Sequence, residues 1–202
     1  MAPKGNNFGG GGNIRQGMDY ICEMAVPDFE SMLVDSSRIV ADMVVSQVGR
    51  DSVQMDELYR LAIEKTGKLA MRSARAFDLV DEAEPGMAAP YISKIRSSIS
   101  TIKHQSVVRC FLRTMLRYPL PADDEDLGRY YQFAIDLIQD SKKPIALRYY
   151  GMFIAHQIAL DLPDLRFELL PLFDEVMRDD QGALKSRARI FKTDLVKKFG
   201  ME

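Results

Sequence analysis

The chain has 202 residues, of which 47% are hydrophobic, so it can bury a sizeable core as one domain. Its formal net charge of −2 argues against a general coat for nucleic acid or membranes, although not against a local basic patch. Only two cysteines are present, far apart in the chain, which argues against a disulfide framework and favours a reducing compartment. The N-terminal region contains no long apolar run, so we expect neither a signal peptide nor a membrane span, and a cytoplasmic location.

Residues 1–13, MAPKGNNFGGGGN, are rich in glycine and nearly free of apolar side chains. We expect a disordered tail here. No lysine-serine or lysine-threonine pair follows the glycines and no strand pattern precedes them, so a phosphate-binding loop is not predicted. The remainder, 14–202, is predicted to be a single domain.

From residue 14 onward, apolar residues recur at helical spacing in segments that glycine, proline or polar residues separate. We find no strand pattern. In the segment 14–25 the apolar residues that share one side are Ile14, Met18, Ile21, Cys22 and Ala25. The predicted helices span about 14–25, 28–48, 51–65, 68–84, 87–102, 104–118, 126–139, 144–160, 164–177 and 184–199.

The second helix of each predicted pair carries one recurring pattern: arginine, any residue, aromatic residue. Successive arginines are 34 to 41 residues apart, a range typical of helical-hairpin repeats. The pattern therefore predicts a solenoid in which equivalent positions share one face. The copies are Arg75-Ala-Phe77, Arg109-Cys-Phe111, Arg148-Tyr-Tyr150 and Arg189-Ile-Phe191, with Arg38-Ile-Val40 as a weaker fifth.

Two first helices agree as well, because MAAPYISKI and ELLPLFDEV place Pro90 and Pro171 about one turn in, before an apolar stripe. In these features, residues 28–199 resemble the HEAT-repeat family, whose first helices carry a similar proline and whose second helices open with a valine-arginine-like pair. Here that pair is Val108-Arg109 and Leu147-Arg148. The segments PIALRYYGM and LKSRARIF also resemble a group of small bacterial HEAT-like proteins with no settled biochemical activity.

This resemblance implies an all-α fold, a right-handed αα-superhelix of the HEAT/armadillo-like solenoid type with about four to five helical hairpins. The aspartate that the family usually carries in the turn before the repeated arginine is missing. Leu69, Lys103, Lys142 and Ala183 stand at that position. The arginines are therefore open to two interpretations: they bind a ligand, or they pair with a carboxylate or helix end of the next repeat.

Residues with catalytic or metal-binding chemistry are few. His104 is expected at a helix start, and His156 on an apolar stripe, where we interpret it as a hydrogen-bonded core histidine. Neither has a cysteine or carboxylate at metal-ligand spacing, so no zinc site is predicted. Cys110 lies beside Arg109, but we expect a buried, inert thiol. We predict no catalytic residue, metal, cofactor or small-molecule substrate, and no enzymatic activity.

Charge is distributed unevenly in the C-terminal half. The second-helix segments 103–118 and 182–199 carry four and six positive charges, against a single negative one, and 142–160 carries three. The first-helix segments 123–140 and 164–180 carry six carboxylates each. Because the second helices of a solenoid line one face, we predict one basic and one acidic face. The predicted binding residues are Arg109, Arg113, Arg117, Arg148, Lys185, Arg189 and Lys192.

Two interpretations of this charge stay open. The charge sets either offset each other across neighbouring helices and keep the surface soluble, or form a basic binding groove. A groove predicts a scaffold that binds an acidic or extended segment of a protein partner. The alternative is nucleic-acid binding of the DNA-repair type through the same groove, with steep salt dependence. Some HEAT-like proteins are DNA glycosylases, but the tryptophan such enzymes use is absent. Reversing Arg113, Arg117 and Lys192 to glutamate is expected to abolish partner capture and leave helicity intact.

Overall fold

The computed structural model describes residues 27–178 and 182–200. Within these ranges every regular element is a helix and no strand occurs. The predicted tail at 1–13 and the predicted helix at 14–25 lie outside the described residues. The α-helices are α1 (Phe29–Met32), α2 (Arg38–Val48), α3 (Ser52–Glu64), α4 (Gly67–Ala83), α5 (Ile92–Ser98), α6 (Gln105–Met115), α7 (Asp124–Gln139), α8 (Ile145–Asp161), α9 (Arg166–Arg178) and α10 (Gly182–Phe199). The 3₁₀ helices are η1 (Ala89–Tyr91), η2 (Ile99–Thr101) and η3 (Pro163–Leu165).

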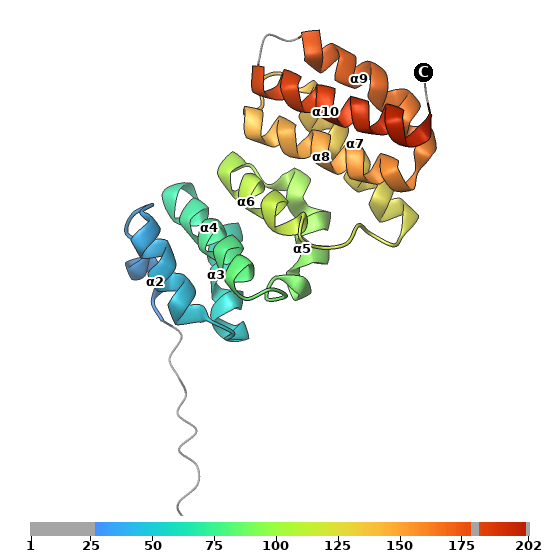
Figure 1. Cartoon of the computed structure of the whole chain (residues 1–202). Coiled ribbons are helices and arrows are strands. Elements are labelled where there is room, and N and C mark those ends of the chain that lie inside the picture. Colours follow the sequence, from blue (N-terminus) through green and yellow to red (C-terminus); the bar gives the residue numbers. More distant parts are fainter. Residues whose placement is uncertain (1–26, 179–181, 201–202) are drawn as a thin grey trace, which may run out of the picture.

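The helices form hairpins that stack in chain order (Figure 1). The pairs are α3 with α4, α5 with α6, α7 with α8 and α9 with α10. The second helices α2, α4, α6, α8 and α10 pack on one another in sequence and form one continuous layer. We call the exposed side of this layer the second-helix face. The predicted all-α HEAT-like solenoid is therefore confirmed.

The predicted single helix at 28–48 is wrong, because the chain breaks between Met32 and Arg38. Polar side chains in the break bond the local backbone in place of a continuing helix. Asp35 Oδ1 accepts from Ser37 N at 2.7 Å, and Ser37 Oγ accepts from Val40 N at 3.2 Å as the N-cap of α2. At the other end of α2, Gly49 supplies a φ of 48°, which suits glycine.

The predicted helix at 87–102 is divided into η1, α5 and η2. Pro90 lies in the 3₁₀ turn η1, where its missing N–H leaves no backbone bond unmade. At the other end, the hydroxyl of Ser98 donates to Lys94 O and that of Thr101 donates to Ser98 O, each at 2.7 Å. Such side-chain bonds to backbone carbonyls favour short and irregular helices. The result is a short first helix in this hairpin.

The repeated aromatic residue belongs to the core in three of its four copies. Phe77 and Phe111 are fully buried, with ring centroids 5.6 Å apart, and Phe191 is 8% exposed. In α8 the register differs, because Gly151 is buried and Tyr150 is only half-buried. A Cβ on Gly151 would lie 2.7 Å from the Ala134 carbonyl oxygen, so glycine allows α8 to approach the α7 backbone closely. The predicted register in α8 is therefore wrong by one residue.

Candidate functional site

Two of the predicted binding arginines belong to an ion-pair network that joins α6 to α4. Arg117 Nη2 lies 2.9 Å from Asp78 Oδ1 and 2.9 Å from Asp81 Oδ2. Arg113 Nη1 lies 3.3 Å from Asp78 Oδ2, and Arg113 also pairs with Glu82. Both aspartates are 1% exposed and need a positive partner at this depth. We call this network the Asp–Arg ladder; it connects successive hairpins and neutralises much of the charge of the two arginines.

Neutral donors fill the remaining acceptor sites of the buried carboxylates. Asp81 Oδ1 accepts from Ala88 N at 2.8 Å and from the Tyr118 hydroxyl. Asp78 Oδ1 accepts from Thr114 Oγ1 at 3.0 Å. Burial raises the pKa of Asp78, and the nearby Arg117 and Arg113 oppose that rise. The ladder is thus a hydrogen-bonded unit of the fold, and a partner does not have to complete it.

Arg148 does not reach the second-helix face, which corrects its prediction as a binding residue. The residue is 3% exposed, and its Nε donates to Ile138 O at 3.0 Å near the end of α7. The one-residue change of register in α8 explains the difference, because it turns Arg148 inward and the following tyrosines outward.

The basic residues of α10 point in different directions. Lys192 Nζ lies 2.5 Å from Asp174 Oδ1 of α9, and Lys185, two turns earlier, shares that side of the helix. Arg187 lies on the side facing α8, since Asp194, two turns later, bonds a side chain of α8. Arg189 is exposed. The seven predicted binding residues are therefore not brought together at one place.

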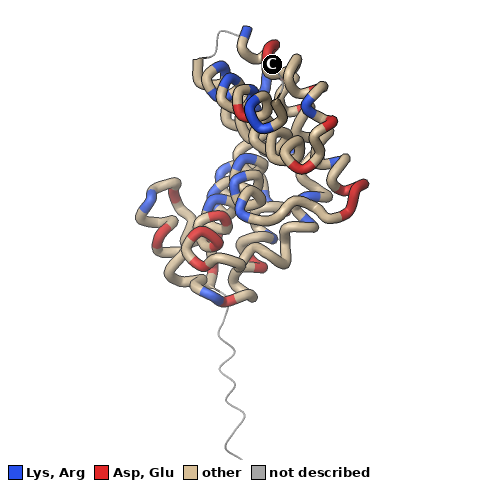
Figure 2. The backbone as a smooth tube through the Cα atoms, turned by 45° about the vertical axis from the view of Figure 1, so that its right-hand side comes forward, with Lys and Arg blue, Asp and Glu red and all other residues tan. Residues whose placement is uncertain are grey.

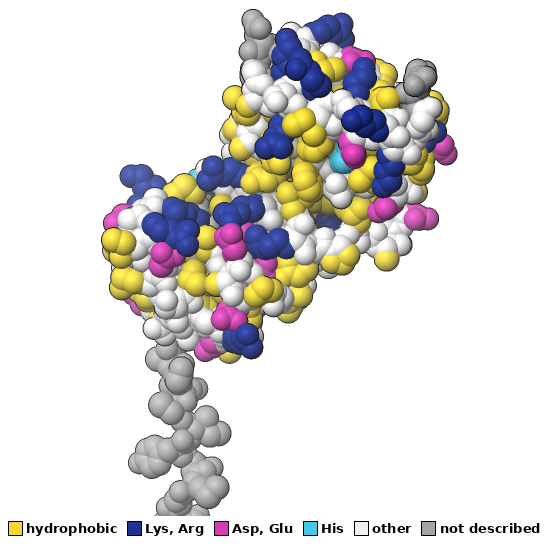
Figure 3. Space-filling model, viewed as in Figure 1, with side chains coloured by type: hydrophobic (Ala, Val, Ile, Leu, Met, Phe, Trp, Pro, Cys, Tyr) yellow, Lys and Arg dark blue, Asp and Glu magenta, His cyan; other side chains and the backbone are white. Residues whose placement is uncertain are grey.

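The structure instead shows an uncharged aromatic surface between α6 and α10. Tyr149, Tyr150 and Phe153 are partly exposed on α8, and we call them the aromatic strip. The guanidinium of Arg187 lies over Tyr149, 5.5 Å from the ring centroid. Arg109 on α6 is exposed and, with Arg113, opposes the rise that burial causes in the pKa of Tyr150. Figure 3 shows this apolar band between basic side chains on either side.

Arg109 and Arg187, the flanking arginines, differ from the ladder arginines in one respect. Neither forms an ion pair with a carboxylate in the part of the chain that the structure describes. Lys142 and Lys143 lie in the turn before α8, so α8 itself contributes no exposed cation to this face. The predicted continuous basic face is thus divided in two, while the acidic start of α7 lies apart from both (Figure 2).

A family model for the HEAT repeat domain matches residues 30–193. The chain belongs to the HEAT repeat family. No curated protein and no solved structure matches it. The family match covers the hairpins α3–α4, α5–α6 and α7–α8, the last of which carries the aromatic strip, and it ends within α10. HEAT repeats generally serve as scaffolds for protein–protein interaction, so an exposed aromatic surface on one of them is a candidate interaction site.

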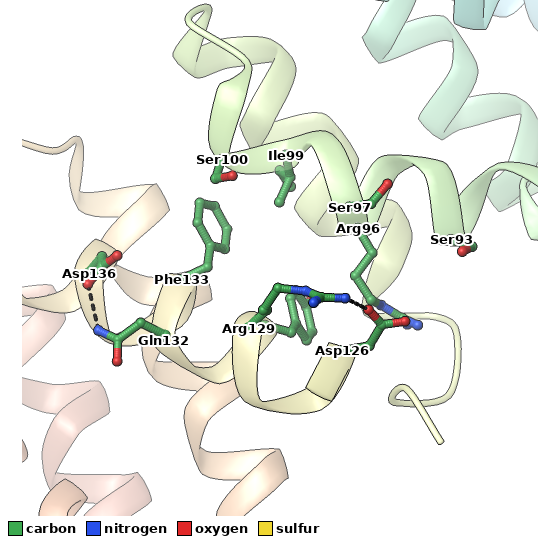
Figure 4. A pocket seen from close by; sticks show the side chains of 11 residues that line it. Ser93, Arg96, Ser97, Ile99, Ser100, Asp126, Arg129, Gln132, Phe133 and Asp136 are labelled. Carbon is green, nitrogen blue, oxygen red and sulfur yellow. Dashed lines mark hydrogen bonds and ion pairs between the residues drawn. The ribbon is translucent and has the colours of Figure 1, made fainter. Parts of the chain in front are cut away.

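A cavity of about 270 Å³ separates α5 from α7 on the other side of the HEAT solenoid (Figure 4). Its charged groups largely satisfy one another: Arg129 pairs with Asp126, and Gln132 Nε2 donates to Asp136 Oδ1 at 2.8 Å. Arg96 donates to Pro119 O at 2.8 Å. The Arg96 Nε is buried without a hydrogen-bond partner, whereas the other charged groups of the cavity are paired. Because this cavity lies between α5 and α7, the main contact between the α5–α6 hairpin and the α7–α8 hairpin is made by α6 and α8. Among the described residues no ion pair joins α6 to α8.

The titratable core residues of this HEAT repeat protein behave as predicted. His156 is 5% exposed, its Nε2 lies 2.9 Å from Asp194 Oδ2, and its ring stacks on Phe191 with centroids 4.7 Å apart. Burial lowers the pKa of His156, and Asp194 opposes this. Burial raises the pKa of the Cys110 thiol to about 11. His104 holds the N-cap position of α6 without a side-chain cap bond.

Neither a metal centre nor a membrane span is found in the described ranges. No group of three His, Cys, Asp or Glu side chains there could hold a metal ion. None of the helices there is both long and apolar enough to cross a bilayer.

The aromatic strip and Arg187 are the residues that the sequence reasoning missed as a site. Tyr149 and Phe153 share the apolar stripe on which the sequence places His156, and the repeated pattern groups Tyr150 with Phe77, Phe111 and Phe191. A signal was available in the two consecutive tyrosines, because neighbours on a helix are about 100° apart and both cannot point into the core. Gly151 was the second signal, since a glycine within a helix often marks a close approach.

Proposed function

We propose that this protein is a non-enzymatic HEAT repeat scaffold that binds an acidic, extended segment of a protein partner across the aromatic strip. The observation that carries the proposal is the position of the strip between Arg109 and Arg187, which have no carboxylate partner among the described residues. A cytoplasmic location, expected from the scarcity of cysteine, is part of the proposal.

The chemistry of the strip supports an acidic segment that also carries apolar residues. Tyrosine and phenylalanine supply large, rigid contact area and are frequent at the centres of protein interfaces. A guanidinium without a carboxylate partner can donate two hydrogen bonds to an incoming carboxylate without first breaking an existing ion pair. A bound carboxylate would thus replace water at the flanking arginines, while apolar residues of the segment cover the strip.

Of the predicted binding residues, the proposal keeps Arg109 and Arg113, whose side chain is 44% exposed although it takes part in the ladder. Arg117 serves the ladder and Arg148 is buried, so both are left out. Lys185 and Lys192 lie on the α9 side of α10, where only a segment that continues past α8 would reach them. The same holds for the exposed Arg189.

Short random peptides displayed on phage can be selected against the full chain, and the recovered sequences measured by fluorescence anisotropy. We expect acidic sequences with apolar residues. The double variant Arg109→Glu with Arg187→Glu should bind them at least roughly tenfold more weakly, since each charge-assisted bond contributes about 1.5–3 kcal/mol. A matched control, Lys94→Glu with Lys103→Glu, makes the same change in net charge at exposed sites of the α5 hairpin. Its affinity should stay within about twofold of the unaltered chain, because both lysines lie outside the strip.

Equal binding by both double variants would overturn the proposal, as would recovered peptides without an acidic bias. A labelled single-stranded oligothymidylate is measured in parallel at several salt concentrations. Exposed aromatics and arginines also suit stacked bases and phosphates. Tight binding of this probe that weakens steeply with salt, and is lost with Arg109 and Arg187, would replace the acidic peptide with nucleic acid.

A further inference from the structure

A surface hollow of about 380 Å³ lies between the C-terminal ends of α6 and α8, beside the aromatic strip. We call it the junction hollow. Phe153, the last residue of the strip, lines this hollow, so the two features are continuous. Both are on the side of the molecule that Figure 3 shows. The junction hollow is distinct from the cavity between α5 and α7, although Arg96 and Tyr130 line both.

The junction hollow is lined mainly by apolar side chains of α6, α8 and the connector between α6 and α7. Met115 is 2% exposed and Ile154 is 1% exposed, whereas Leu116 and Leu120 are partly exposed. Ligand sites in proteins typically measure about 300–1,000 Å³ and combine an apolar lining with a few polar groups. The hollow therefore suits one large, mainly apolar side chain.

A guanidinium in the hollow favours an aromatic ring over an aliphatic chain. The guanidinium of Arg96 lies 5.4 Å from the centroid of the Tyr130 ring, and Nη2 donates to Pro119 O at 2.8 Å. These two contacts hold the group at the hollow, which Arg96 lines. Guanidinium planes pack on aromatic faces, so a ring that enters the hollow gains a contact that an aliphatic chain lacks.

Gln157 gives the hollow a hydrogen-bond acceptor. The Nε2 atom of His156 lies 2.9 Å from Asp194 Oδ2, so its Nδ1 accepts from Gln157 Nε2 at 3.3 Å. This leaves Gln157 Oε1 without a donor among the described residues. An indole N–H or a phenol O–H supplies the donor that this oxygen lacks. Tryptophan and tyrosine therefore match the hollow better than phenylalanine.

The distance from the flanking arginines to the hollow sets where this aromatic residue stands in a bound segment. Arg109 acts on Tyr150, and Gln157 is about two turns further along α8. Two turns of helix rise by about 10 Å, which about three residues of extended chain span. Asp161 also lines the hollow and disfavours a carboxylate there. The acidic residue of the segment thus belongs at the arginines and its aromatic residue at the hollow.

We propose that the junction hollow holds a tryptophan or tyrosine side chain of the acidic partner segment, about three residues from the acidic residue that binds the flanking arginines. This inference rests on the proposed function, because it assigns a second contact to the same segment. The arginines select the charge of the segment, and the hollow selects its aromatic residue.

Two defined peptides test the proposal by calorimetry with the full chain. Both consist of glycine and serine with two adjacent glutamates, and the residue three positions beyond the glutamates is tryptophan in one probe and alanine in the other. The tryptophan probe should bind at least about tenfold more tightly, since buried aromatic anchors dominate binding at interfaces. The chain contains no tryptophan, so the emission of the probe reports its own surroundings and should move to shorter wavelength on binding.

A filled hollow should remove this advantage. Gln157→Phe places a ring in the hollow, so the two probes should bind to this variant within about twofold of each other. Gln132→Phe is the matched control, on an exposed residue of α7 that lines the other cavity, and it should keep the tenfold difference. Circular dichroism checks that both variants fold. The comparison of the two probes on the unaltered chain decides the proposal even if Gln157→Phe does not.

Equal binding of the two probes, still dependent on Arg109 and Arg187, would overturn the hollow as a binding site and leave the proposed function standing. Unshifted emission from the bound tryptophan probe would do the same. If instead the emission shift survives Arg109→Glu with Arg187→Glu, the hollow is retained and the acidic segment is refuted. Absence of binding by both probes would refute both.

Two further outcomes separate the possible occupants. N-acetyltryptophanamide that binds as tightly as the tryptophan probe would assign the hollow to a free aromatic molecule and overturn its role as an anchor for the segment. The peptides selected on phage give an independent measurement. They should be enriched in tryptophan or tyrosine about three residues from an acidic residue, and an acidic bias without this spacing would overturn the inference alone.

Discussion

Arg117, two residues past the end of α6, donates from Nε to Asp81 of α4 at 2.9 Å, across the boundary between two hairpins. The aspartate typical of HEAT-repeat turns is missing from this chain, and Leu69 and Lys103 stand at the equivalent sequence positions of these hairpins. The cross-repeat pairing is instead made by carboxylates inside α4 and by arginines in and just after α6. Buried carboxylates on one second helix bind arginines at the C-terminal end of the next, and this fixes how the two helices pack.

Replacing Arg117 with methionine should destabilise the protein by about 3 kcal/mol, because it leaves buried carboxylates without their closest cation. Urea unfolding followed by circular dichroism measures the loss. The control is Arg38→Met, which breaks an exposed pair with Asp42, 70% and 51% exposed, and should cost less than about 1 kcal/mol. Similar small losses in both variants would show that the ladder adds little to stability.

The ladder also changes what charge reversal measures. Arg113, Arg117 and Lys192 all pair with carboxylates of a neighbouring helix. Glutamate at these positions would face those carboxylates and weaken helix packing along with any binding. The flanking arginines avoid this difficulty, which is why they are the variants chosen for the binding test.

Gly151→Ala should destabilise the protein by about 1–3 kcal/mol, since the new methyl group would collide with the Ala134 carbonyl and force α8 away from α7. Gly128→Ala in α7 is the matched control. No atom lies within 4 Å of a Cβ placed there, so better helix propensity should stabilise the protein by up to about 1 kcal/mol. The two changes in unfolding free energy should have opposite signs; equal signs would contradict the close approach.

Stability should decline as the pH falls from 7.5 to 5 because of His156. Burial lowers its pKa in the folded protein below the value near 6.5 of an unfolded chain. A histidine with a depressed folded pKa contributes stability above the unfolded pKa, and that contribution is lost as the pH falls through the folded pKa. Urea midpoints measured across this range should fall less steeply in His156→Phe than in the unaltered protein.

Asp194→Asn sharpens the pH test. Asp194 raises the pKa of His156, whereas Lys198 lowers it, so the amide substitution should depress this pKa further. The loss of stability toward acid should then grow relative to the unaltered chain. Identical pH profiles for all three proteins would mean that His156 does not control this titration.

Cys110 should resist alkylation in the folded protein. Its thiol is 6% exposed, and a pKa of about 11 leaves almost no thiolate at pH 8. In a Cys22→Ser background, iodoacetamide should leave the folded chain unmodified by mass spectrometry and add one group after unfolding in urea. Rapid modification without urea would show that α6 opens, or that the thiol is accessible.

The sequence predicts the repeat architecture well because each helix carries its own periodic apolar face, and glycines such as Gly49 mark the ends. The break before α2 was missed because hydrogen bonds from Asp35 and Ser37, which are local and polar, interrupt a continuous apolar pattern. The ladder was missed because Asp78 and Asp81 are charged residues in an inward-facing stripe, and only the packed neighbour shows that they have partners.

The candidate site on α8 depends on which residues of this helix face the core. Assigning Arg148 by its likeness to the other arginines places it outward, yet the close approach at Gly151 turns α8 by one residue and exposes Tyr149 and Tyr150 instead. A match in residue type at equivalent sequence positions does not fix side-chain direction when one repeat packs more tightly than the others. The packing of α8 against α7 therefore decides which side chains form the candidate site. The sequence alone predicts that arginines and aromatic residues lie on α8, but not which of them are exposed.

The junction of α6 with α8 has a mechanical consequence. The ladder ties α4 to α6 with buried charges, whereas no ion pair among the described residues crosses from α6 to α8, and the first helices beside this seam are separated by a cavity. If the molecule is stretched between its ends, the interface between α6 and α8 should separate before the interfaces between the other neighbouring hairpins. Arg109 and Arg187 lie on opposite sides of this interface, so a ligand that binds both would resist its separation and make the solenoid stiffer.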